Sequence, residues 1–474
     1  MNRIGDRKIV IGLMLLQVAV CAPFLNSFPI DLDEPFSVFI AQQDMSEFIP
    51  ELQEGNNSPL YFILLHFWIK IFGIGAVAVR SLSLFFSVLT LPILYKLGKS
   101  LLEREYALVA CLFFIFSTFM HYHSMEARMY SLFVMLTVFA YYDLNKFIFD
   151  NSKVFWRLAI WNVLLFYTHY LSIFIIGTEV IIFFFLFKNI TQKKLLHFII
   201  SGVISLILIV PGLSQLLTRS AEYTDGSNWV PETNYTALYG NIIRFFNHTI
   251  SISILFGLCT IFILINRKKI LAVVRNYWRD QKVHFVILAF VVPYVGMFVV
   301  SRLVTPIFLD RYLLFTVPFL YLLVAFIIKV SLQDYKKWYF LVLFVLPLVI
   351  SCAYVPDTNR ETDKVANYVH ENAGNNDLII LCPPFYDLTF IYHFDQAIFF
   401  DYKNTRNRIS ESNILRVYSW DEVGETESFN KIIFVDSHAE FLYPNNGIIK
   451  GLEENRTYFT SKEFKGNCVV YIYK

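Results

Sequence analysis

The sequence predicts an all-α polytopic membrane domain followed by a small α/β domain. Apolar residues make up 56% of the 474-residue chain and charged residues only 16%, whereas soluble domains carry about 25% charged residues. Apolar runs long enough to cross a bilayer, roughly 20 residues each, recur up to residue 353. Beyond it the apolar runs shorten, and Asn, Gly and charged residues become frequent. We therefore expect a membrane domain at 1–353 and a second domain at 354–474.

Eleven apolar segments are expected to cross the membrane, and basic residues give their direction. Cytoplasmic connections carry an excess of Lys and Arg. Such residues precede the first segment and recur after every second one, which puts the N-terminus in the cytoplasm and the C-terminal domain outside it. The segments are 9–28, 80–98, 107–124, 127–145, 156–169, 171–187, 196–217, 241–265, 283–301, 310–329 and 337–353.

The segment 59–72 is apolar enough to cross as well, but a crossing there would move all later basic connections outside. We therefore expect a helix that lies in the outer interface, with His66 and Lys70 directed towards lipid headgroups.

The residues after 353 contain short apolar runs bounded by turn residues, as strands of a small domain do. The expected helix is Thr362–Asn372, and the expected strands are Leu378–Cys382, Ala397–Phe400, Lys431–Val435 and Cys468–Tyr473. Cys382 and Cys468 both fall here and could pair, although a disulfide is not the favoured expectation. The six cysteines form no CxxC pair and no metal-ligand spacing. No run of Lys and Arg resembles a nucleic-acid footprint, so no nucleic-acid partner is expected.

An acidic pair, Asp33-Glu34, follows the first apolar run. A carboxylate inside a bilayer costs several kcal/mol, so a pair at a membrane exit suggests chemistry or cation binding. Asp33 could act as a general base on a hydroxyl group, with Glu34 sharing the work. Taken alone, the position favours a cap of the helix that follows, because Asp is a favoured N-cap residue and Pro35 suits a first helical turn.

Arg128, Arg302 and Arg311 lie on the expected outer side, against the usual bias of basic residues. A guanidinium group matches a phosphate bidentately and keeps its charge when partly desolvated. The alternative is local pairing, of Arg128 with Glu126 and of Arg311 with Asp310. Three such arginines at one face favour the phosphate interpretation.

The order of these motifs resembles the membrane glycosyltransferases of the GT-C fold that use polyprenyl-phosphate sugars, the group of protein O-mannosyltransferases and lipid A aminoarabinose transferases. The resemblance covers residues 1 to about 330. It is carried by Asp31-Leu32-Asp33-Glu34, Asn57-Ser58-Pro59-Leu60-Tyr61, Glu126-Ala127-Arg128-Met129-Tyr130, Tyr167-Thr168-His169-Tyr170 and Asp310-Arg311-Tyr312.

The resemblance implies two interfacial helices in the first outer loop and an inverting transfer of a hexosyl or pentosyl group. The donor would be a polyprenyl-phosphate sugar and the acceptor a hydroxyl group of a lipid, polysaccharide or protein at the outer face of a bacterial cytoplasmic membrane. It implies Asp33 as base with Glu34 and Glu126 in support, and Arg128, Arg311, Arg302 and Asn57 at the donor phosphate. It places His169, Tyr170, Tyr130 and Tyr61 in the substrate pocket. Taken alone, His169 is better explained as a polar residue satisfied at a hairpin turn than as a ligand.

One position departs from the pattern. Asn57 stands where the family usually has His or Lys, so a charged contact is missing there. This leaves open whether a divalent cation takes part.

Two other functions compete with the enzyme. A transporter or flippase of a lipid-linked sugar would also carry ionisable residues, but usually near the bilayer midplane on broken helices within repeats. Here they gather at one face and no repeat is evident. A non-catalytic scaffold for cell-envelope assembly, with the α/β domain as its binding part, is the other alternative.

Overall fold

The structure is a computed structural model that describes residues 3–54, 57–150, 154–186, 191–222, 230–332, 338–356, 360–439, 443 and 445–474. The chain forms two compact units. The first comprises Met1–Leu25, Ile49–Tyr61 and Arg80–Tyr354, and the second Asn26–Phe48, Phe62–Val79 and Val355–Lys474. Two segments that follow the first helix thus group with the C-terminal part of the chain.

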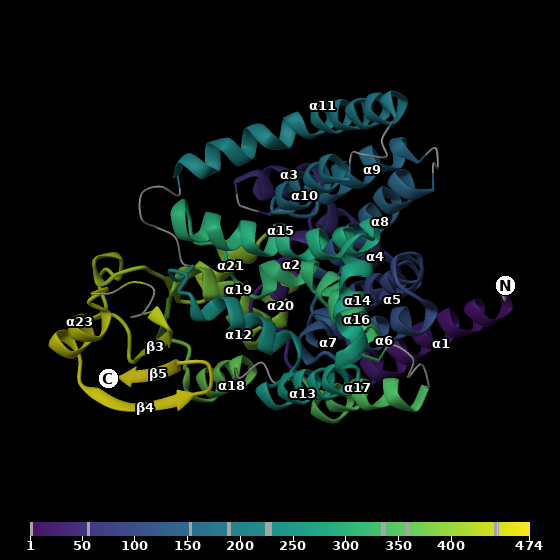
Figure 1. The fold of residues 1–474 in the computed structure, drawn as a ribbon. Helices are drawn as coiled ribbons and strands as arrows, with labels where there is room; N and C mark the ends of the chain where they lie inside the picture. Colours follow the sequence, from purple (N-terminus) through teal and green to yellow (C-terminus); the bar gives the residue numbers. More distant parts are fainter. Residues whose placement is uncertain are drawn as a thin grey trace. The chain divides into compact units, whose positions relative to one another are not determined.

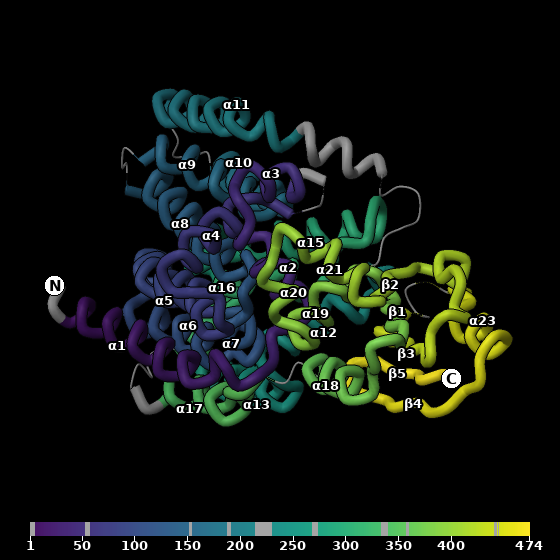
Figure 2. The backbone as a smooth tube through the Cα atoms, turned by 180° about the vertical axis from the view of Figure 1, so that it is seen from behind, coloured from purple at the N-terminus to yellow at the C-terminus, as the bar shows by residue number. Residues whose placement is uncertain are grey.

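The first unit is helical. Within it α9 lies beside both α8 and α11 (Figures 1 and 2). Its helices are α1 (Arg3–Cys21), η1 (Ala22–Phe24), α5 (Ala76–Leu101, whose first residues belong to the second unit), α6 (Arg104–Phe116), α7 (Thr118–Met125), α8 (Tyr130–Phe149), α9 (Phe155–Phe166), α10 (Ser172–Phe185), α11 (Gln192–Glu222), α12 (Thr236–Phe245), α13 (Thr249–Ile265), α14 (Arg267–Trp278), α15 (Gln281–Leu303), η4 (Arg311–Thr316), α16 (Val317–Leu332) and α17 (Trp338–Ser351).

Six helices of the described chain are long and apolar enough to cross a membrane, or up to eight if two bent pairs each form one span. The pairs are α6 with α7, bent by 63°, and α12 with α13, bent by 86°. Helices α9, α10 and α17 are shorter and apolar. Each of the eleven predicted segments overlaps one of these helices or pairs, while the number of crossings itself stays a prediction.

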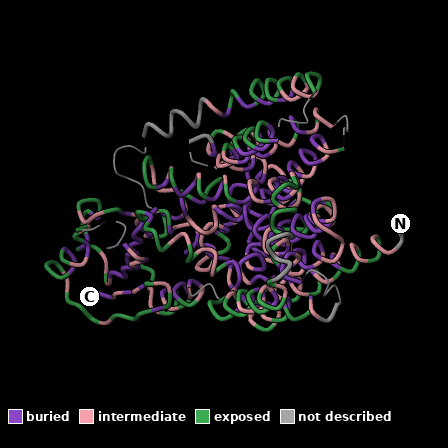
Figure 3. Tube along the Cα trace, in the orientation of Figure 1, coloured by how far each residue is buried: buried purple, intermediate pink, exposed green. Residues whose placement is uncertain are grey.

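Apolar side chains cover much of the outside of the first unit. Along α11, for example, Leu196, Val203, Ile207 and Val210 are exposed (Figure 3). Such a surface is unfavourable in water and suits the hydrocarbon of a bilayer. The protein is therefore a multi-pass membrane protein, as its composition predicts.

The second unit contains a five-stranded mixed sheet with the order β2-β1-β3-β5-β4 (Figure 1). The first three strands in this order are parallel and the remaining pairings are antiparallel. The strands are β1 (Leu378–Cys382), β2 (Ile414–Arg416), β3 (Ile432–Ser437), β4 (Tyr458–Phe464) and β5 (Cys468–Tyr473). The helices after residue 354 are α18 (Thr362–Asn372), η5 (Pro384–Tyr386), α19 (Asp387–Phe394), α20 (Gln396–Phe400), α21 (Thr405–Glu411), η6 (Trp420–Glu422) and α23 (Ile448–Asn455).

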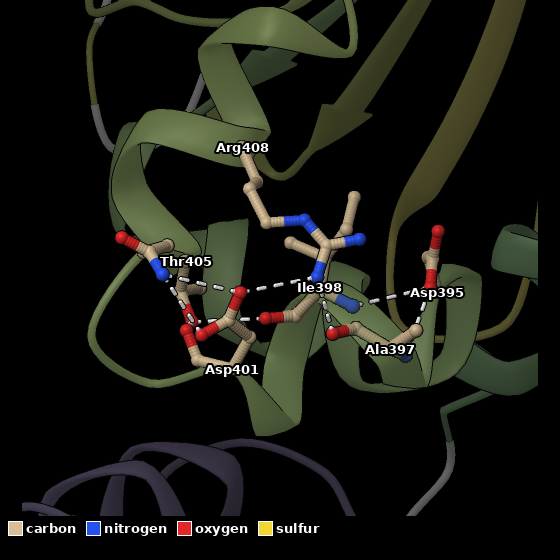
Figure 4. A network of polar contacts seen from close by, with 7 residues as sticks. Asp395, Ala397, Ile398, Asp401, Thr405 and Arg408 are labelled. Carbon is tan, nitrogen blue, oxygen red and sulfur yellow. Dashed lines mark hydrogen bonds and ion pairs between the residues drawn. The ribbon is translucent and has the colours of Figure 1, made fainter.

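The predicted helix at 362–372 and the strands at 378–382 and 468–473 are confirmed, and the strand predicted at 431–435 is β3. The strand predicted at Ala397–Phe400 is wrong, because these residues form α20. The side chain of Asp395 accepts hydrogen bonds from the backbone N–H groups of Ala397 at 2.8 Å and Ile398 at 3.2 Å (Figure 4). This N-cap starts a helix in a run whose apolar residues are also compatible with a strand. All six cysteines are free and buried.

In its described residues, the connection between α1 and α5 contains three α-helices, α2 (Glu34–Gln42), α3 (Met45–Glu54) and α4 (Leu60–Phe72), where the resemblance implied two interfacial helices. Nδ1 of His66 lies 2.9 Å from the carbonyl oxygen of Ala41, and the His66 side chain is buried. The expectation that His66 faces lipid headgroups is therefore wrong, because its ring fastens α4 to α2. Lys70, one turn later, is exposed as expected.

Candidate functional site

The acidic segment of the first loop belongs to the second unit. Asp31 is buried, and its Oδ1 accepts hydrogen bonds from the backbone N–H of Leu32 at 2.6 Å and from the Thr362 hydroxyl at 2.9 Å. Leu32 has a φ of 56°, a left-handed conformation that is uncommon for a residue with a branched side chain. This turn directs the chain into Asp33 and the start of α2.

Asp33 occupies the N-cap position of α2 and Pro35 lies in the first turn, so the position agrees with the helix-cap alternative. Within this described segment, however, the Asp33 side chain makes no capping hydrogen bond. Its carbonyl oxygen instead accepts from the N–H and the hydroxyl of Ser37, both at 3.1 Å. The Asp33 carboxylate is half-buried and that of Glu34 is buried. The catalytic roles of both carboxylates stay predictions.

Glu126 lies in the first unit, at the end of α7. Its Oε2 lies 2.6 Å from Nδ1 of His123, and both side chains are buried. The His123 ring also contacts the rings of Phe119 and Tyr130, with centroids 4.8 and 5.3 Å away. Glu126 is thus held firmly by one neighbour, three residues earlier in the chain, that the sequence argument did not use.

Three of the sequence motifs meet in the first unit. Nη2 of Arg128 donates to Oδ1 of Asn57 over 3.4 Å, and only 6% of Arg128 is exposed. The Arg128 carbonyl accepts from the Ser83 hydroxyl at 3.2 Å, and that hydroxyl lies 3.0 Å from the hydroxyl of Tyr61. The backbone N–H of Leu60 donates to the carbonyl of Tyr167 at 2.8 Å. The Asn57, Arg128 and Tyr167 motifs therefore come together although they are far apart in sequence.

His169 lies in the turn between α9 and α10, among aromatic rings. It stacks on Phe133 with centroids 5.2 Å apart and meets the edge of Tyr312 at 5.5 Å; Tyr130 is 6.4 Å away. Removal from water lowers the pKa of the His169 imidazole, and the positive charges of Arg128 and Arg311 lower it further, to about 3. The positive charges of two guanidinium groups from separate motifs thus favour the neutral form of one imidazole.

The pairing expected for Asp310 differs in the structure. Its carboxylate forms an ion pair with Arg244 of α12, and its Oδ1 also accepts the backbone N–H of Arg311 at 2.6 Å. The guanidinium of Arg311 lies over the ring of Tyr312, 5.7 Å from its centroid. Sequence reasoning missed Arg244, because nothing in the spacing links it to a carboxylate 66 residues away.

Two further predicted residues, Arg302 and Tyr170, contact different parts of the first unit. Arg302 is exposed, donates to the carbonyl of Thr233 at 2.7 Å, and lies over the ring of Tyr235 at 5.3 Å. Tyr170 is half-buried and packs on Phe166, with centroids 5.4 Å apart. Arg302 therefore anchors the segment before α12, and its assignment to the donor phosphate has less geometric support than those of Arg128 and Arg311.

No group of three or more His, Cys, Asp or Glu side chains in the described part of the chain is arranged to hold a metal ion.

Comparison with known proteins identifies the fold. The family model of dolichyl-phosphate-mannose-protein mannosyltransferases matches residues 56–214, a range that holds the Asn57, Arg128 and His169 motifs. A search of the curated proteins finds no match.

Solved structures resemble nearly the whole chain at low sequence identity. ArnT from Cupriavidus metallidurans in the apo state has a TM-score of 0.59 at 10% identity, over 97% of this chain and 98% of that chain. ArnT bound to undecaprenyl phosphate has a TM-score of 0.57 at 10% identity, over 98% and 97%. The apo oligosaccharyltransferase of Archaeoglobus fulgidus also gives 0.57 at 10% identity, over 98% of this chain and 75% of that chain.

These proteins are GT-C glycosyltransferases. The chain is therefore a membrane protein with the GT-C glycosyltransferase fold, and its residues 56–214 match the dolichyl-phosphate-mannose-protein mannosyltransferase family.

Proposed function

We propose that this protein transfers a glycosyl group from a polyprenyl-phosphate-linked sugar to an acceptor hydroxyl at the outer face of a bacterial cytoplasmic membrane. The observation that carries the proposal is the cluster around His169, whose ring stacks on Phe133 and meets the edge of Tyr312. Arg311 lies over the same Tyr312 ring, and the buried Arg128 donates to Asn57. Two positive charges beside an uncharged, aromatic-lined histidine favour an anion. The fold adds support, because the similar ArnT has been crystallised with undecaprenyl phosphate.

In this proposal the donor phosphate binds Arg128 and Arg311. A guanidinium group donates two parallel hydrogen bonds to a phosphate, and such charge-assisted bonds are about twice as strong as neutral ones. Asn57, which bonds Arg128, helps to fix the direction of that guanidinium. The phosphate gains negative charge as its bond to the sugar breaks, so the same contacts strengthen as the reaction proceeds.

The transfer itself is a single displacement. The acceptor oxygen attacks the anomeric carbon while the carbon–oxygen bond to the phosphate breaks, and polyprenyl phosphate leaves. Because attack and departure occur on opposite faces, the anomeric configuration inverts. Asp33 takes the proton of the acceptor hydroxyl, and Glu34, the next residue in the chain, supports it.

The proposal is tested by comparing Asp33→Asn with Asp44→Asn, which changes an exposed carboxylate of the same loop. The protein is purified from membranes, and its co-purifying polyprenyl lipid is identified by mass spectrometry. A donor made from that lipid with a radiolabelled sugar is then supplied, and transfer of the sugar to membrane acceptors is measured. Losing a general base should slow transfer by about 10²–10⁴-fold without changing the amount of bound lipid, and Asp44→Asn should match the wild type. Near-normal turnover of Asp33→Asn would exclude Asp33 as the base.

A further inference from the structure

Three side chains that follow the membrane spans in sequence hold the peptide that leads into Asp33. Nε2 of His393 lies 2.6 Å from the carbonyl oxygen of Ile30, and the Thr389 hydroxyl donates to the carbonyl of Leu32 at 3.0 Å. The Thr362 hydroxyl donates to the carboxylate of Asp31 at 2.9 Å. All these residues belong to the same compact unit. Each of the residues Ile30, Asp31 and Leu32 thus forms one hydrogen bond with a side chain of α18 or α19.

The hydrogen bond to Asp31 is buried, and those of Thr389 and His393 are part-buried. Ile30 is 2% exposed, Asp31 3%, Thr362 3% and Thr389 4%. A buried carbonyl or carboxylate that loses its donor stays desolvated, so breaking such a bond costs more than breaking one at the surface. The three contacts therefore restrain the loop, the buried bond to Asp31 most strongly.

The restrained peptide is also conformationally strained. Leu32 has a φ of 56°, and a non-glycine residue keeps such a conformation only where its surroundings enforce it. Its N–H is held by Asp31 and its carbonyl by Thr389. The strained residue directly precedes Asp33, so the turn at Leu32 sets the direction in which the Asp33 side chain leaves the backbone.

Packing extends the same restraint to the helix that Asp33 starts. Helix α2 packs against α19 and α20, and the rings of Phe39 and Phe399 meet edge-on at 6.1 Å. The hydrogen bonds thus fix one side of Asp33, and this packing fixes the helix on its other side.

We propose that Thr362, Thr389 and His393 are positioning residues for the reaction, which hold Ile30–Leu32 so that the Asp33 carboxylate keeps its catalytic direction. This role rests on the proposed function of Asp33. In this proposal the C-terminal α/β part positions the general base for glycosyl transfer, and it is more than a spacer.

The restraint is measured first without reference to activity, by hydrogen–deuterium exchange of the full-length protein in detergent. Thr389→Val and His393→Ala should each speed exchange in residues 30–37 about fivefold, as expected for one lost hydrogen bond. His393→Gln should restore slow exchange, because its amide N–H reaches nearly the position of the histidine Nε2. Exchange in β1 and β3 should not change, which shows that the sheet stays folded.

A matched control lies in the same unit. The side-chain amide of Asn455 in α23 donates to the carbonyl of Gly451 at 2.7 Å, so Asn455→Ala removes one hydrogen bond of the same unit outside α18, α19 and α20. It should leave exchange at residues 30–37 unchanged. If Thr389→Val and His393→Ala also leave this exchange unchanged, the proposed restraint does not exist, whatever the activities are.

Turnover then tests the positioning role. Misdirecting a catalytic group costs up to about 100-fold in rate, so kcat should fall about 10- to 100-fold in Thr389→Val and His393→Ala, with KM for the donor unchanged and kcat restored in His393→Gln. Faster exchange with normal kcat would refute positioning while leaving the proposed function intact. Normal turnover in Asp33→Asn would instead refute the role of Asp33, and the exchange data would still decide whether the restraint exists.

Discussion

The neutral state of His169 predicts a specific pH dependence of stability. An unperturbed histidine has a pKa of about 6.5, whereas loss of hydration and the charges of Arg128 and Arg311 lower the pKa of His169 to about 3 in the folded protein. Between these two values the unfolded chain binds a proton that the folded protein rejects. Acidification from pH 6.5 towards pH 3 should therefore favour unfolding.

The size of the effect follows from the same two values. One pH unit below the unfolded pKa, at pH 5.5, protonation of the unfolded chain lowers the free energy of unfolding by about 1.4 kcal/mol. At pH 7.5 the effect is below about 0.1 kcal/mol. Replacing His169 with Asn removes the titrating group, so this part of the pH dependence should disappear in the variant.

The measurement is the free energy of unfolding in detergent micelles at pH 7.5 and 5.5 for the wild type, His169→Asn and the control His370→Asn, whose histidine is exposed. The loss between the two pH values should be about 1.4 kcal/mol smaller in His169→Asn than in the other two proteins. Equal losses in all three, or a larger loss in His169→Asn, would show that His169 is not held neutral and would remove the electrostatic argument for a positive pocket.

The remaining predictions concern the donor, the supporting acid and the topology. If Arg128 and Arg311 bind the donor phosphate, Arg→Lys at either should weaken polyprenyl-phosphate binding by about one to two decades, because Lys lacks the planar fork; unchanged affinity in both variants would refute this assignment. Glu126→Gln should lower the free energy of unfolding by about 1–3 kcal/mol, because its buried imidazole partner loses a charged acceptor; a stability equal to the wild type would show that the pair contributes little. An impermeant thiol reagent should label a cysteine placed at residue 425 in intact cells and one at residue 192 only after lysis; the reverse pattern would invert the topology.

Much of the fold could be predicted from the sequence because hydrophobicity and charge are local signals. Each expected span overlaps an apolar helix or bent pair, and the helix at 362–372 was predicted with its bounds. The error at Ala397–Phe400 has a local cause as well. A run of four apolar residues fits a strand or a helix, and the decision lies with the side chain of Asp395, two residues before the run.

The candidate site was less predictable because its partners are set by tertiary packing. The motifs around Asn57, Arg128 and His169 could be chosen from their order in the chain, and the structure brings them together. The ion pair of Asp310 with Arg244 and the bond from His66 to Ala41 leave no pattern in the sequence. A polar residue in an apolar segment signals that a partner exists, but not which one.

The placement of the acidic loop illustrates the same limit over the longest distances in the chain. The composition changes near residue 354, where the spans end, yet compactness groups residues 26–48 with the C-terminal part. Three hydrogen bonds connect the acidic loop to this part, and their partners are separated by 331, 357 and 363 positions in the sequence. Each bond uses one threonine or histidine side chain whose sequence neighbours do not mark it as a partner. At Leu32 a left-handed conformation coincides with such contacts, because Asp31 accepts the Leu32 N–H and Thr389 donates to its carbonyl. The geometry before Asp33 is therefore a property of the folded unit as a whole, and a membrane domain defined by composition alone would leave out the side chains that determine it.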